Sequence, residues 1–432
     1  MHKAFQYRIY PSKRQKILLS KTFGCNRYIW NHFLNLENQT YKDTKKFLFY
    51  TKKANQLVDL KKNIEFLNEV NSQTLQQTLK HQDSAFKKFL KDKKRCGYPV
   101  FKSKKHRQSV TFPQHTEINT ESGYTKICKI GNIPTIFHRK LEGRIKSCTV
   151  SFSPAGSYYI SFCCEIDKPL PEKAKIESDK SLAIDLGLHD FLVSSDGTRI
   201  SNPKFFRKSE NKLVHHQRLL SRKTKDSKNY KEQRIQVAKV HESIRNKRKD
   251  FLYNLIKYIC NDNQITTVFV ENLNIQGMQR NHKLAKSIQD SSWGELKRIL
   301  QYKFDWQGKN LVEIDRFFPS SKTCNTCGNY HKDLTLSDRT WICPECGTKL
   351  DRDLNAAKNL LEFGLYSTVS SKLYACSTLP RIATSGEVKE RSMEPITSTE
   401  IRNSSGKLRQ RSGLMLSELQ NSFSQAPAFR QG

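Results

Sequence analysis

The sequence predicts a multidomain α+β protein: an N-terminal β-barrel with a helical insertion, then an α/β domain that contains a four-cysteine zinc ribbon, then a disordered C-terminal tail. Three observations support this order. Alternating apolar residues occur at the N-terminus and again after residue 108, and helical periodicity lies between them. From residue 181 onward, strand-like and helical runs alternate. Two closely spaced cysteine pairs lie near the end of this second region.

The N-terminal half begins with a predicted strand. Phe5, Tyr7 and Ile9 alternate until Pro11 ends the run, and Ser12 can then cap a helix. Apolar residues at helical spacing continue for most of the next eighty positions or so. Later in this half, alternating residues flank a Pro-Ala-Gly-Ser turn and predict a β-hairpin. We assign the barrel to residues 1–20 together with 109–175, and the helical insertion to residues 21–108.

The second half alternates strands and helices. A strand-like segment ends in a turn at 196–197, and a long basic helical stretch with one apolar stripe follows it. Further on, the pattern predicts a strand at 265–270, a helix at 293–306, a strand at 311–314 and a last helix from Asn355. The predicted domains of this half are an α/β domain at 180–365, the ribbon at 320–350 within it and a disordered tail at 366–432.

The charge of the chain indicates a polyanionic partner. Lys and Arg number 76 against 41 Asp and Glu, so the formal net charge is +35 and nucleic acid is the expected partner. A membrane surface is the competing polyanion. However, no segment reaches the roughly 20 apolar residues of a spanning helix, and the first residues lack the apolar core of a signal peptide. We therefore expect a cytoplasmic protein.

Four cysteines form the most specific local motif. Cys324 and Cys327 are separated by two residues, and so are Cys343 and Cys346. A glycine follows the second cysteine of each pair. This spacing is typical of a tetrahedral Zn²⁺ site, whereas four unrelated buried cysteines have no reason to be paired. Because protein ligands fill all four positions, we expect the Zn²⁺ to be structural.

Three acidic residues are candidate ligands of a second metal centre. Asp185 lies in an apolar strand, Glu271 ends another and Asp353 precedes a helix. A carboxylate in an apolar strand must be paired, protonated or metal-bound, although a solvent-facing strand end or a helix cap explains any one of them equally well. Together, three carboxylates can hold two divalent ions for phosphodiester hydrolysis, and oxygen ligands favour Mg²⁺.

These motifs resemble those of a known family. Ala-Ile-Asp-Leu-Gly at 183–187, Val-Glu-Asn-Leu at 270–273, the split cysteine ribbon and Asp-Arg-Asp-Leu-Asn-Ala-Ala at 351–357 occur in the order found in TnpB, the OrfB protein of small bacterial insertion sequences. The same core occurs in type V CRISPR effectors. The resemblance covers most of residues 1–365. Its N-terminal matches are the segments 3–11, 26–31 and 97–104.

The resemblance implies an RNA-guided, Mg²⁺-dependent DNA endonuclease of a small insertion sequence. A wedge-like barrel, a helical recognition insertion and a split RuvC/RNase H-like nuclease domain with the zinc ribbon would bind a guide RNA and a double-stranded DNA target. The resemblance assigns Asp185, Glu271 and Asp353 as catalytic acids; Asp353 is preferred to Asp351 because the family's acid lies two residues before Asn355. It also implies a bacterial cytoplasmic protein, associated with the nucleoid through DNA. Monomer and dimer both stay open.

One position departs from the family, and several positions are candidates for nucleic-acid contacts. Leu350 stands where relatives often have histidine, so any accessory role of that histidine is absent here. Aromatic and basic residues of the first half could stack on bases or read a short flanking motif, although such aromatics more often belong to the core. The candidates are Tyr28, Trp30, Tyr98, Phe101, Lys102 and Lys104.

Two other functions fit the same fold. A guide-dependent DNA-binding repressor would be expected to lose acids from the triad, and all three acids are present. A transposase or transposase-accessory protein predicts strand joining; the sequence has no feature of a tyrosine or serine recombinase, although RNase H-like chemistry could serve such a reaction. The sequence specifies neither the guide RNA, nor the flanking motif, nor the cut positions.

Overall fold

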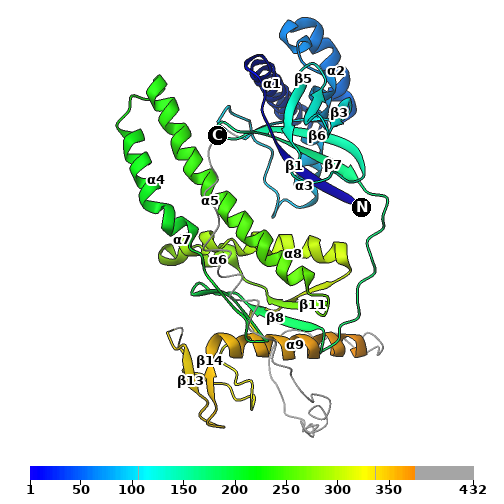
Figure 1. The fold of residues 1–432 in the computed structure, drawn as a ribbon. Coiled ribbons are helices and arrows are strands. Elements are labelled where there is room, and N and C mark those ends of the chain that lie inside the picture. Colours follow the sequence, from blue (N-terminus) through cyan, green and yellow to red (C-terminus); the bar gives the residue numbers. More distant parts are fainter. Residues whose placement is uncertain (106, 336, 375–432) are drawn as a thin grey trace. The chain divides into compact units, whose positions relative to one another are not determined.

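The computed structural model describes residues 1–105, 107–335 and 337–374 (Figure 1). These residues have a mixed α/β fold with a curled seven-stranded sheet, a five-stranded sheet and a four-cysteine cluster. The predicted mixed α/β class is thus confirmed. Most of the predicted tail, from residue 375 on, lies outside the described residues. Along the described chain, no helix has both the length and the apolar character needed to cross a membrane.

The first sheet is antiparallel, with the strand order β2-β6-β7-β1-β5-β4-β3. Strands β6 and β7 pair along their length on either side of the Pro-Ala-Gly-Ser turn, which confirms the predicted hairpin. Tyr7, Val150, Ile160 and Phe162 are buried on one face and form its core. Closure of this sheet into a barrel stays a prediction. The strands are β1 His2–Ile9, β2 Gln108–Phe112, β3 Thr116–Asn119, β4 Tyr124–Ile127, β5 Gly131–Ile136, β6 Arg144–Phe152 and β7 Tyr158–Glu165.

Helices lie between β1 and β2 in the sequence. Ser12 caps α1 as predicted: its side chain accepts the backbone N–H of Gln15, whose side chain accepts the backbone N–H of Ser12. Since α1 begins at Lys13, this helix runs across the border that we predicted at residue 20. A fully buried ion pair of Lys53 with Glu37 joins α2 to α1. The elements are α1 Lys13–Thr44, α2 Tyr50–Asn63, the 3₁₀ turn η1 Glu65–Asn68 and α3 Ser72–Lys91.

The second sheet is mixed, with the order β10-β9-β8-β11-β12. Strands β8, β11 and β12 are parallel, and β9 and β10 are antiparallel to their neighbours. Parallel neighbours end at the same edge of a sheet, so the last residues of β8, β11 and β12 lie side by side. The strands are β8 Ser181–Asp185, β9 Asp190–Ser194, β10 Arg199–Ser201, β11 Thr267–Glu271 and β12 Asn310–Ile314.

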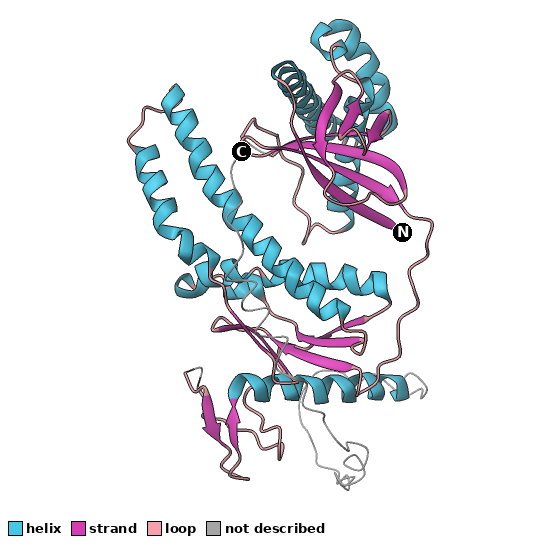
Figure 2. Ribbon diagram, in the orientation of Figure 1, coloured by secondary structure: helices cyan, strands magenta, loops and turns pink. Residues whose placement is uncertain are grey.

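Helices cover both faces of this second sheet (Figure 2). Helix α9 packs on one face, where Ala183, Phe269 and Leu360 are buried together. Helices α5 and α8 pack on the other face, against Ile184 and Val268. Because neighbouring residues of a strand point to opposite faces, both faces of β8 and β11 are apolar, as their sequences indicated. The helices are α4 Phe205–Ser221, α5 Lys228–Asn261, α6 Ile275–Met278, α7 His282–Ser291, α8 Trp293–Gln307 and α9 Arg352–Tyr374.

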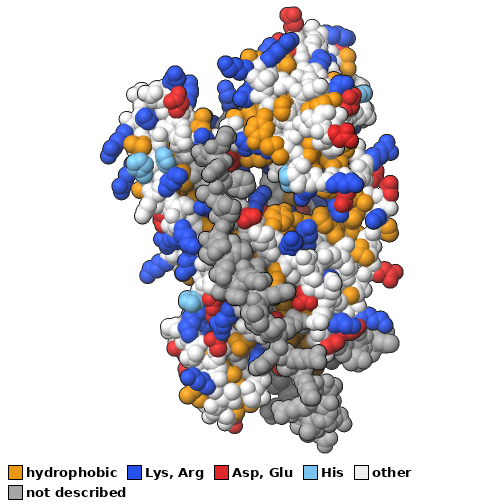
Figure 3. Space-filling model, viewed as in Figure 1, with side chains coloured by type: hydrophobic (Ala, Val, Ile, Leu, Met, Phe, Trp, Pro, Cys, Tyr) orange, Lys and Arg blue, Asp and Glu red, His pale blue; other side chains and the backbone are white. Residues whose placement is uncertain are grey.

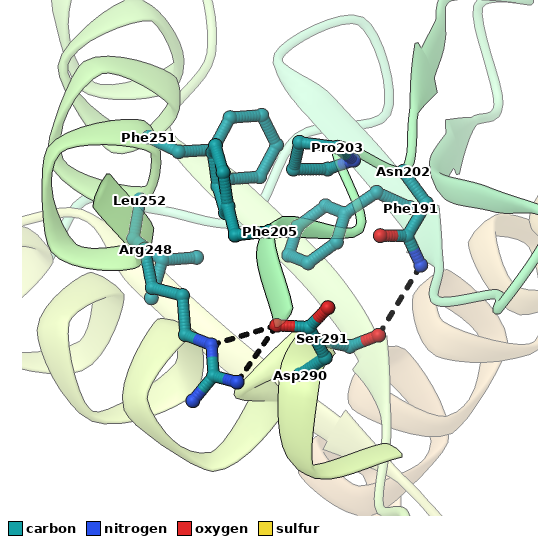
Figure 4. A pocket seen from close by; sticks show the side chains of 9 residues that line it. All are labelled: Phe191, Asn202, Pro203, Phe205, Arg248, Phe251, Leu252, Asp290 and Ser291. Atoms are coloured by element: carbon teal, nitrogen blue, oxygen red, sulfur yellow. Dashed lines mark hydrogen bonds and ion pairs between the residues drawn. The ribbon is translucent and has the colours of Figure 1, made fainter. Parts of the chain in front are cut away.

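A buried carboxylate ties the long α4–α5 hairpin to α7 (Figure 4). Asp290 accepts the backbone N–H of Phe206 at the start of α4, and it pairs with Arg248 Nη2 of α5 at 2.7 Å. Asn202 donates to the Ser291 hydroxyl beside it. These partners compensate the buried charge of Asp290, so we assign the cluster a structural role.

Candidate metal centres

The three predicted acids lie at one edge of the second sheet. Asp185 ends β8, and Glu271 ends the neighbouring parallel strand β11, in which Val270 lies opposite Ile184. Asp353 is the second residue of α9, which packs on the same two strands. Three segments that are distant in the sequence therefore bring their carboxylates to one place.

The pKa of Asp185 reflects its burial and the neighbouring carboxylates. Burial, together with the charges of Asp353 and Glu271, raises the pKa of Asp185 to about 7, while Arg352 acts in the opposite direction. Burial also raises the pKa of Glu271. Each neighbouring negative charge disfavours ionisation of Asp185. A bound cation would relieve this repulsion, so the cluster has the electrostatic character of a cation site.

Two arginines contact the third acid. Arg339 Nη1, from the ribbon, lies 3.3 Å from Asp353 Oδ2, and Arg352 Nη2 lies 3.1 Å from Asp353 Oδ1. Arg339 is exposed, whereas Arg352 and Asp353 are half-buried. The arginines orient this carboxylate and partly neutralise it.

The neighbouring acid has a different role. Asp351 Oδ1 accepts the backbone N–H of Leu354 at 2.9 Å, which caps the start of α9. The same oxygen lies 2.6 Å from Arg199 Nη2. Burial opposes ionisation of Asp351, but the Leu354 N–H and Arg199 outweigh it and lower its pKa. Asp351 is thus committed to a helix cap and an ion pair, whereas the charge of Asp353 reaches Asp185.

The four predicted cysteines converge. The Sγ atoms of Cys324 and Cys346 are 3.8 Å apart, those of Cys327 and Cys343 are 3.6 Å apart, and all four lie within 4.8 Å of one another. Zn–S bonds of roughly 2.3 Å at tetrahedral angles would place the sulfur atoms about 3.8 Å apart. The hydrogen bond between Cys346 Sγ and the Thr348 hydroxyl lowers the pKa of Cys346 to about 6. The residues present therefore fit a Zn²⁺ ion in number, spacing and chemistry.

The acids do not form a closed cluster of this kind. In the part of the chain that the structure describes, the cysteines are the one group of three or more Cys, His, Asp or Glu residues placed to hold a metal ion together. The three carboxylates offer only oxygen atoms, which suit Mg²⁺.

Two asparagines of α9 hold the ribbon against the helix that carries Asp353. Asn355 and Asn359 lie one turn apart, and each donates to the carbonyl oxygen of Thr323, at 2.7 and 2.6 Å. Asn355 Oδ1 also accepts the backbone N–H of Asn325 at 2.9 Å. Both side chains are buried. We did not predict this contact from the sequence; the i, i+4 spacing of the two asparagines was the available signal.

Comparison with known proteins places this chain in a family. A Streptomyces pristinaespiralis protein named "Putative RNA-guided DNA endonuclease" is 38% identical over 368 residues, which span 84% of this chain and 89% of that protein. "Putative RNA-guided DNA endonuclease InsQ" of Escherichia coli K12 is 29% identical over 378 residues, which span 84% of this chain and 92% of InsQ. The chain belongs to the TnpB/OrfB family.

Three family models match parts of this TnpB/OrfB protein. The IS605 OrfB model described as "Probable transposase" matches residues 161–282, and the Cas12f1-like TNB domain matches 293–360. The OrfB model described as a helix-turn-helix domain matches residues 1–46. In that last range the structure has strand β1 and the single continuous helix α1, so the description of the model does not correspond to the local fold here.

Solved structures with some likeness are more distant. A cryo-EM structure of a Cas12f1–sgRNA–target DNA complex gives a TM-score of 0.33 and 16% identity, covering 83% of this chain and 98% of that one. A cryo-EM structure of CasPhi-2 (Cas12j) bound to crRNA gives a TM-score of 0.44 and 10% identity, covering 84% and 98%. Both scores are too low to support an argument about this chain.

The structure provides a packing role for Leu350, which stands where the resemblance led us to expect a histidine. Leu350 lies in β14 (Lys349–Asp351), opposite Trp341 of β13 (Thr340–Ile342). It packs against the small apolar core of the ribbon, which contains Leu334, Trp341 and two of the cysteines. A leucine at this position therefore adds apolar contacts to the ribbon.

The structure explains why a glycine stands at position 187, two residues after Asp185. A Cβ atom at this position would lie 2.7 Å from the carbonyl oxygen of Asp190, because the chain turns back tightly into β9. Only a residue without a Cβ atom therefore allows this close approach of backbone to backbone.

The predicted nucleic-acid contacts of the TnpB/OrfB protein differ in exposure. Trp30 is only 7% exposed, and its indole N–H donates to the Val100 carbonyl, so it belongs to the core and offers no free face to a base. The Lys102 ammonium lies 3.6 Å from the centre of its ring. The Trp30 ring therefore packs against the Lys102 ammonium and helps to position it. The remaining candidates are exposed: Tyr28, Tyr98, Phe101 and Lys104.

Lys102 borders a polar hollow of about 90 Å³ between α1, α3 and β2. Arg27, His81 and Arg107 also line it, together with glutamine, serine and threonine side chains. Arg27 Nη1 donates to Gln108 Oε1 at 3.0 Å, which fixes the guanidinium in the wall. Cations and amides that converge in a hollow suit phosphate and base edges.

Proposed function

We propose that this TnpB/OrfB protein is an RNA-guided, Mg²⁺-dependent DNA endonuclease. The observation that supports this best is the meeting of Asp185, Glu271 and Asp353 at one strand edge, where burial and the charges of the other two acids raise the pKa of Asp185. Two Mg²⁺ ions at such carboxylates activate water and stabilise the leaving oxygen in phosphodiester hydrolysis, by the two-metal RuvC mechanism. Relatives named as RNA-guided DNA endonucleases support the substrate class.

Each acid has its own task in this proposal. Asp185 and Glu271 are fixed by rigid neighbouring strands, so their carboxylates hold a constant separation while DNA enters. Asp353 is brought to them by α9 and oriented by Arg339 and Arg352. The zinc ribbon accepts hydrogen bonds from Asn355 and Asn359 of α9, and it thereby holds this helix and Asp353 in place.

The rest of the chain binds nucleic acid in this proposal. Residues 1–20 and 109–175 are the wedge, 21–108 the recognition insertion, 180–365 the split RuvC/RNase H-like domain and 320–350 its ribbon. Lys and Arg side chains are abundant on the face that Figure 3 shows. With a net charge of +35, such surfaces suit the backbone of a guide RNA paired with DNA. The hollow beside Lys102 suits the reading of a short flanking motif.

The experiment that tests the function is direct. The full chain is purified with its co-expressed RNA, that RNA is sequenced, and DNA that matches it is offered beside a randomised flanking sequence, with Mg²⁺ or with EDTA. We expect specific cuts beside one short motif in Mg²⁺ and none in EDTA.

A matched pair of variants makes this test specific. Asp185→Ala should abolish the cuts, whereas Glu313→Ala should keep them, because Glu313 lies in the same sheet but pairs with Lys297. Tight guided binding by the wild type without any cut in Mg²⁺ would contradict the nuclease and indicate a guided DNA-binding protein.

A further inference from the structure

Phe317 is the most exposed large hydrophobic side chain among the described residues, at 85%. It lies in the loop that leaves β12 toward the ribbon. Its sequence neighbour Phe318 is half-buried and stacks on Phe363 of α9, with ring centres 4.2 Å apart. Phe318 thus anchors the loop, whereas Phe317 points into solvent.

The loop that presents Phe317 is anchored at both ends. At its start, Asp315 Oδ1 accepts the backbone N–H of Phe317 at 2.8 Å, and the Asp315 carbonyl accepts that of Phe318 at 3.2 Å. At its end, the carbonyls of Ser320 and Thr323 accept hydrogen bonds from the two asparagines of α9. The exposed ring is therefore held on an ordered loop, so a partner that binds it loses little conformational entropy.

The position of this loop relates it to the candidate acids. Ile314, the last residue of β12, lies opposite Glu271 in the parallel register, and the Asn272 N–H donates to the Ile314 carbonyl at 2.9 Å. Phe317 follows three residues later, at the edge of the sheet where the acids lie. The Arg316 guanidinium is 6.0 Å from the Phe317 ring centre. An aromatic face beside a cation matches the pairing of base and phosphate in a single strand.

We propose that Phe317 is a stacking platform for one unpaired nucleobase of the DNA strand that is cut, with Arg316 binding an adjoining phosphate. This inference rests on the proposed nuclease function. A phosphodiester reaches the acids only if the strand is held on either side of it, and stacking holds a strand of any sequence. Single exposed apolar side chains are common on protein surfaces, so the proposal depends on an interaction that only an aromatic ring can make.

Substitutions at Phe317 test the aromatic requirement. With the full chain and its co-purified guide RNA, Phe317→Ala and Phe317→Leu should both lower kcat/KM for DNA cutting by roughly 10- to 100-fold, and Phe317→Trp should stay within about threefold of the wild type. The melting temperature should not change, because the ring is exposed. Tyr366→Ala is the control, since this aromatic is 72% exposed on α9 but more than three helical turns beyond Asp353.

A scan with abasic DNA tests the base that stacks. Single abasic sites are placed in turn along each strand around the cut. We expect one position at which the lesion slows the wild type but adds nothing to Phe317→Ala, because the partner of the ring is already missing. With 2-aminopurine at that position, wild-type protein without added Mg²⁺ should quench the fluorescence, and Phe317→Ala should not.

The outcomes separate the inference from the function on which it rests. If the wild type cuts intact DNA but Phe317→Ala cuts equally well, or if abasic effects add to those of Phe317→Ala at every position, the stacking proposal is wrong and the nuclease stands. If Phe317→Leu cuts as well as the wild type, the residue acts by its size and the aromatic proposal is also wrong. If the wild type cuts no DNA, both proposals fall.

Discussion

The cysteine site and the acidic site lie next to each other, but the chain builds them in opposite ways. The cysteines come from two short local motifs, and their sulfur atoms converge within 4.8 Å. The acids come from β8, β11 and α9; all three are half-buried, and Asp353 is paired with two arginines. A closed site holds its metal for stability, whereas an open and electrostatically strained site keeps room for a substrate. The contrast supports the roles proposed above: structure for the first site and chemistry for the second.

The largest effect that would sharpen this contrast is on catalysis. Glu271→Gln and Asp353→Asn should each lower the rate of DNA cutting by roughly 10³-fold or more, because each removes a metal-binding charge from the open site. Affinity for guide RNA and matching DNA should change by less than about threefold, because no phosphate-binding cation is lost. Single-turnover cutting and equilibrium binding measure the two effects. A large loss of binding in both variants would show that the acids stabilise the fold instead.

Removal of zinc should have the next largest effect, and this effect should be on structure. Cys343→Ser, or extraction with a chelator, should release the ion and expose residues 320–350 to proteolysis, since such a small element depends on its metal. Cutting should fall as well, because the ribbon supports α9. Metal analysis and limited proteolysis measure the change. Cys128→Ser is the control, because this half-buried cysteine lies outside the cluster; normal cutting by a zinc-free protein would contradict the supporting role.

A loosened contact between the two sites should have a smaller effect. The double variant Asn355→Ala, Asn359→Ala removes the hydrogen bonds that join the ribbon to α9 and leaves buried carbonyls unpaired, at a cost of about 1–3 kcal/mol for each group. We expect zinc to be retained, kcat to fall by roughly tenfold and KM to change little. Lys358→Ala, at the exposed position between them, should have no effect. Loss of zinc from the double variant would show that the asparagines build the ribbon itself.

The acidic site also predicts a pH dependence in metal-free protein. The pKa of Asp185 is raised to about 7 from an ordinary value near 4, so the folded state binds its proton more tightly than the unfolded state. The protein should therefore lose stability as the pH rises from about 4 to 7. Asp185→Asn should reduce this loss, as melting temperatures without added Mg²⁺ would measure. Identical pH profiles for the two proteins would contradict a raised pKa of Asp185 at this site.

The smallest effect concerns nucleic-acid binding by the first half of the chain. Lys102→Ala should weaken DNA or RNA binding several-fold and lower the slope of log affinity against log salt by roughly one, because one phosphate contact is lost. The change should be larger than that of Lys16→Ala, an exposed lysine on α1 away from the hollow. Equal salt slopes for the two variants would show that Lys102 does not contact the nucleic acid.

Much of this organisation could be predicted from the sequence, because it depends on local patterns. The cysteine spacing, the β6–β7 turn, the Ser12 cap and the acids that end apolar strands are each specified by a few neighbouring residues. What could not be predicted depends on contacts between distant segments. The arginine partners of Asp351 and Asp353 and the burial of Trp30 are examples. The same is true of the opposite orientations of Phe317 and Phe318, since two adjacent phenylalanines look alike until α9 packs on one of them.

The most direct test of the account is a side-by-side measurement of binding and cutting by Asp185→Ala, with its guide RNA and a matching DNA in Mg²⁺. The account predicts wild-type affinity for the DNA and no detectable cut, because the substitution removes a metal ligand and leaves the nucleic-acid surface intact. Cutting at the wild-type rate by Asp185→Ala would contradict the central claim that the three acids at this strand edge carry the chemistry.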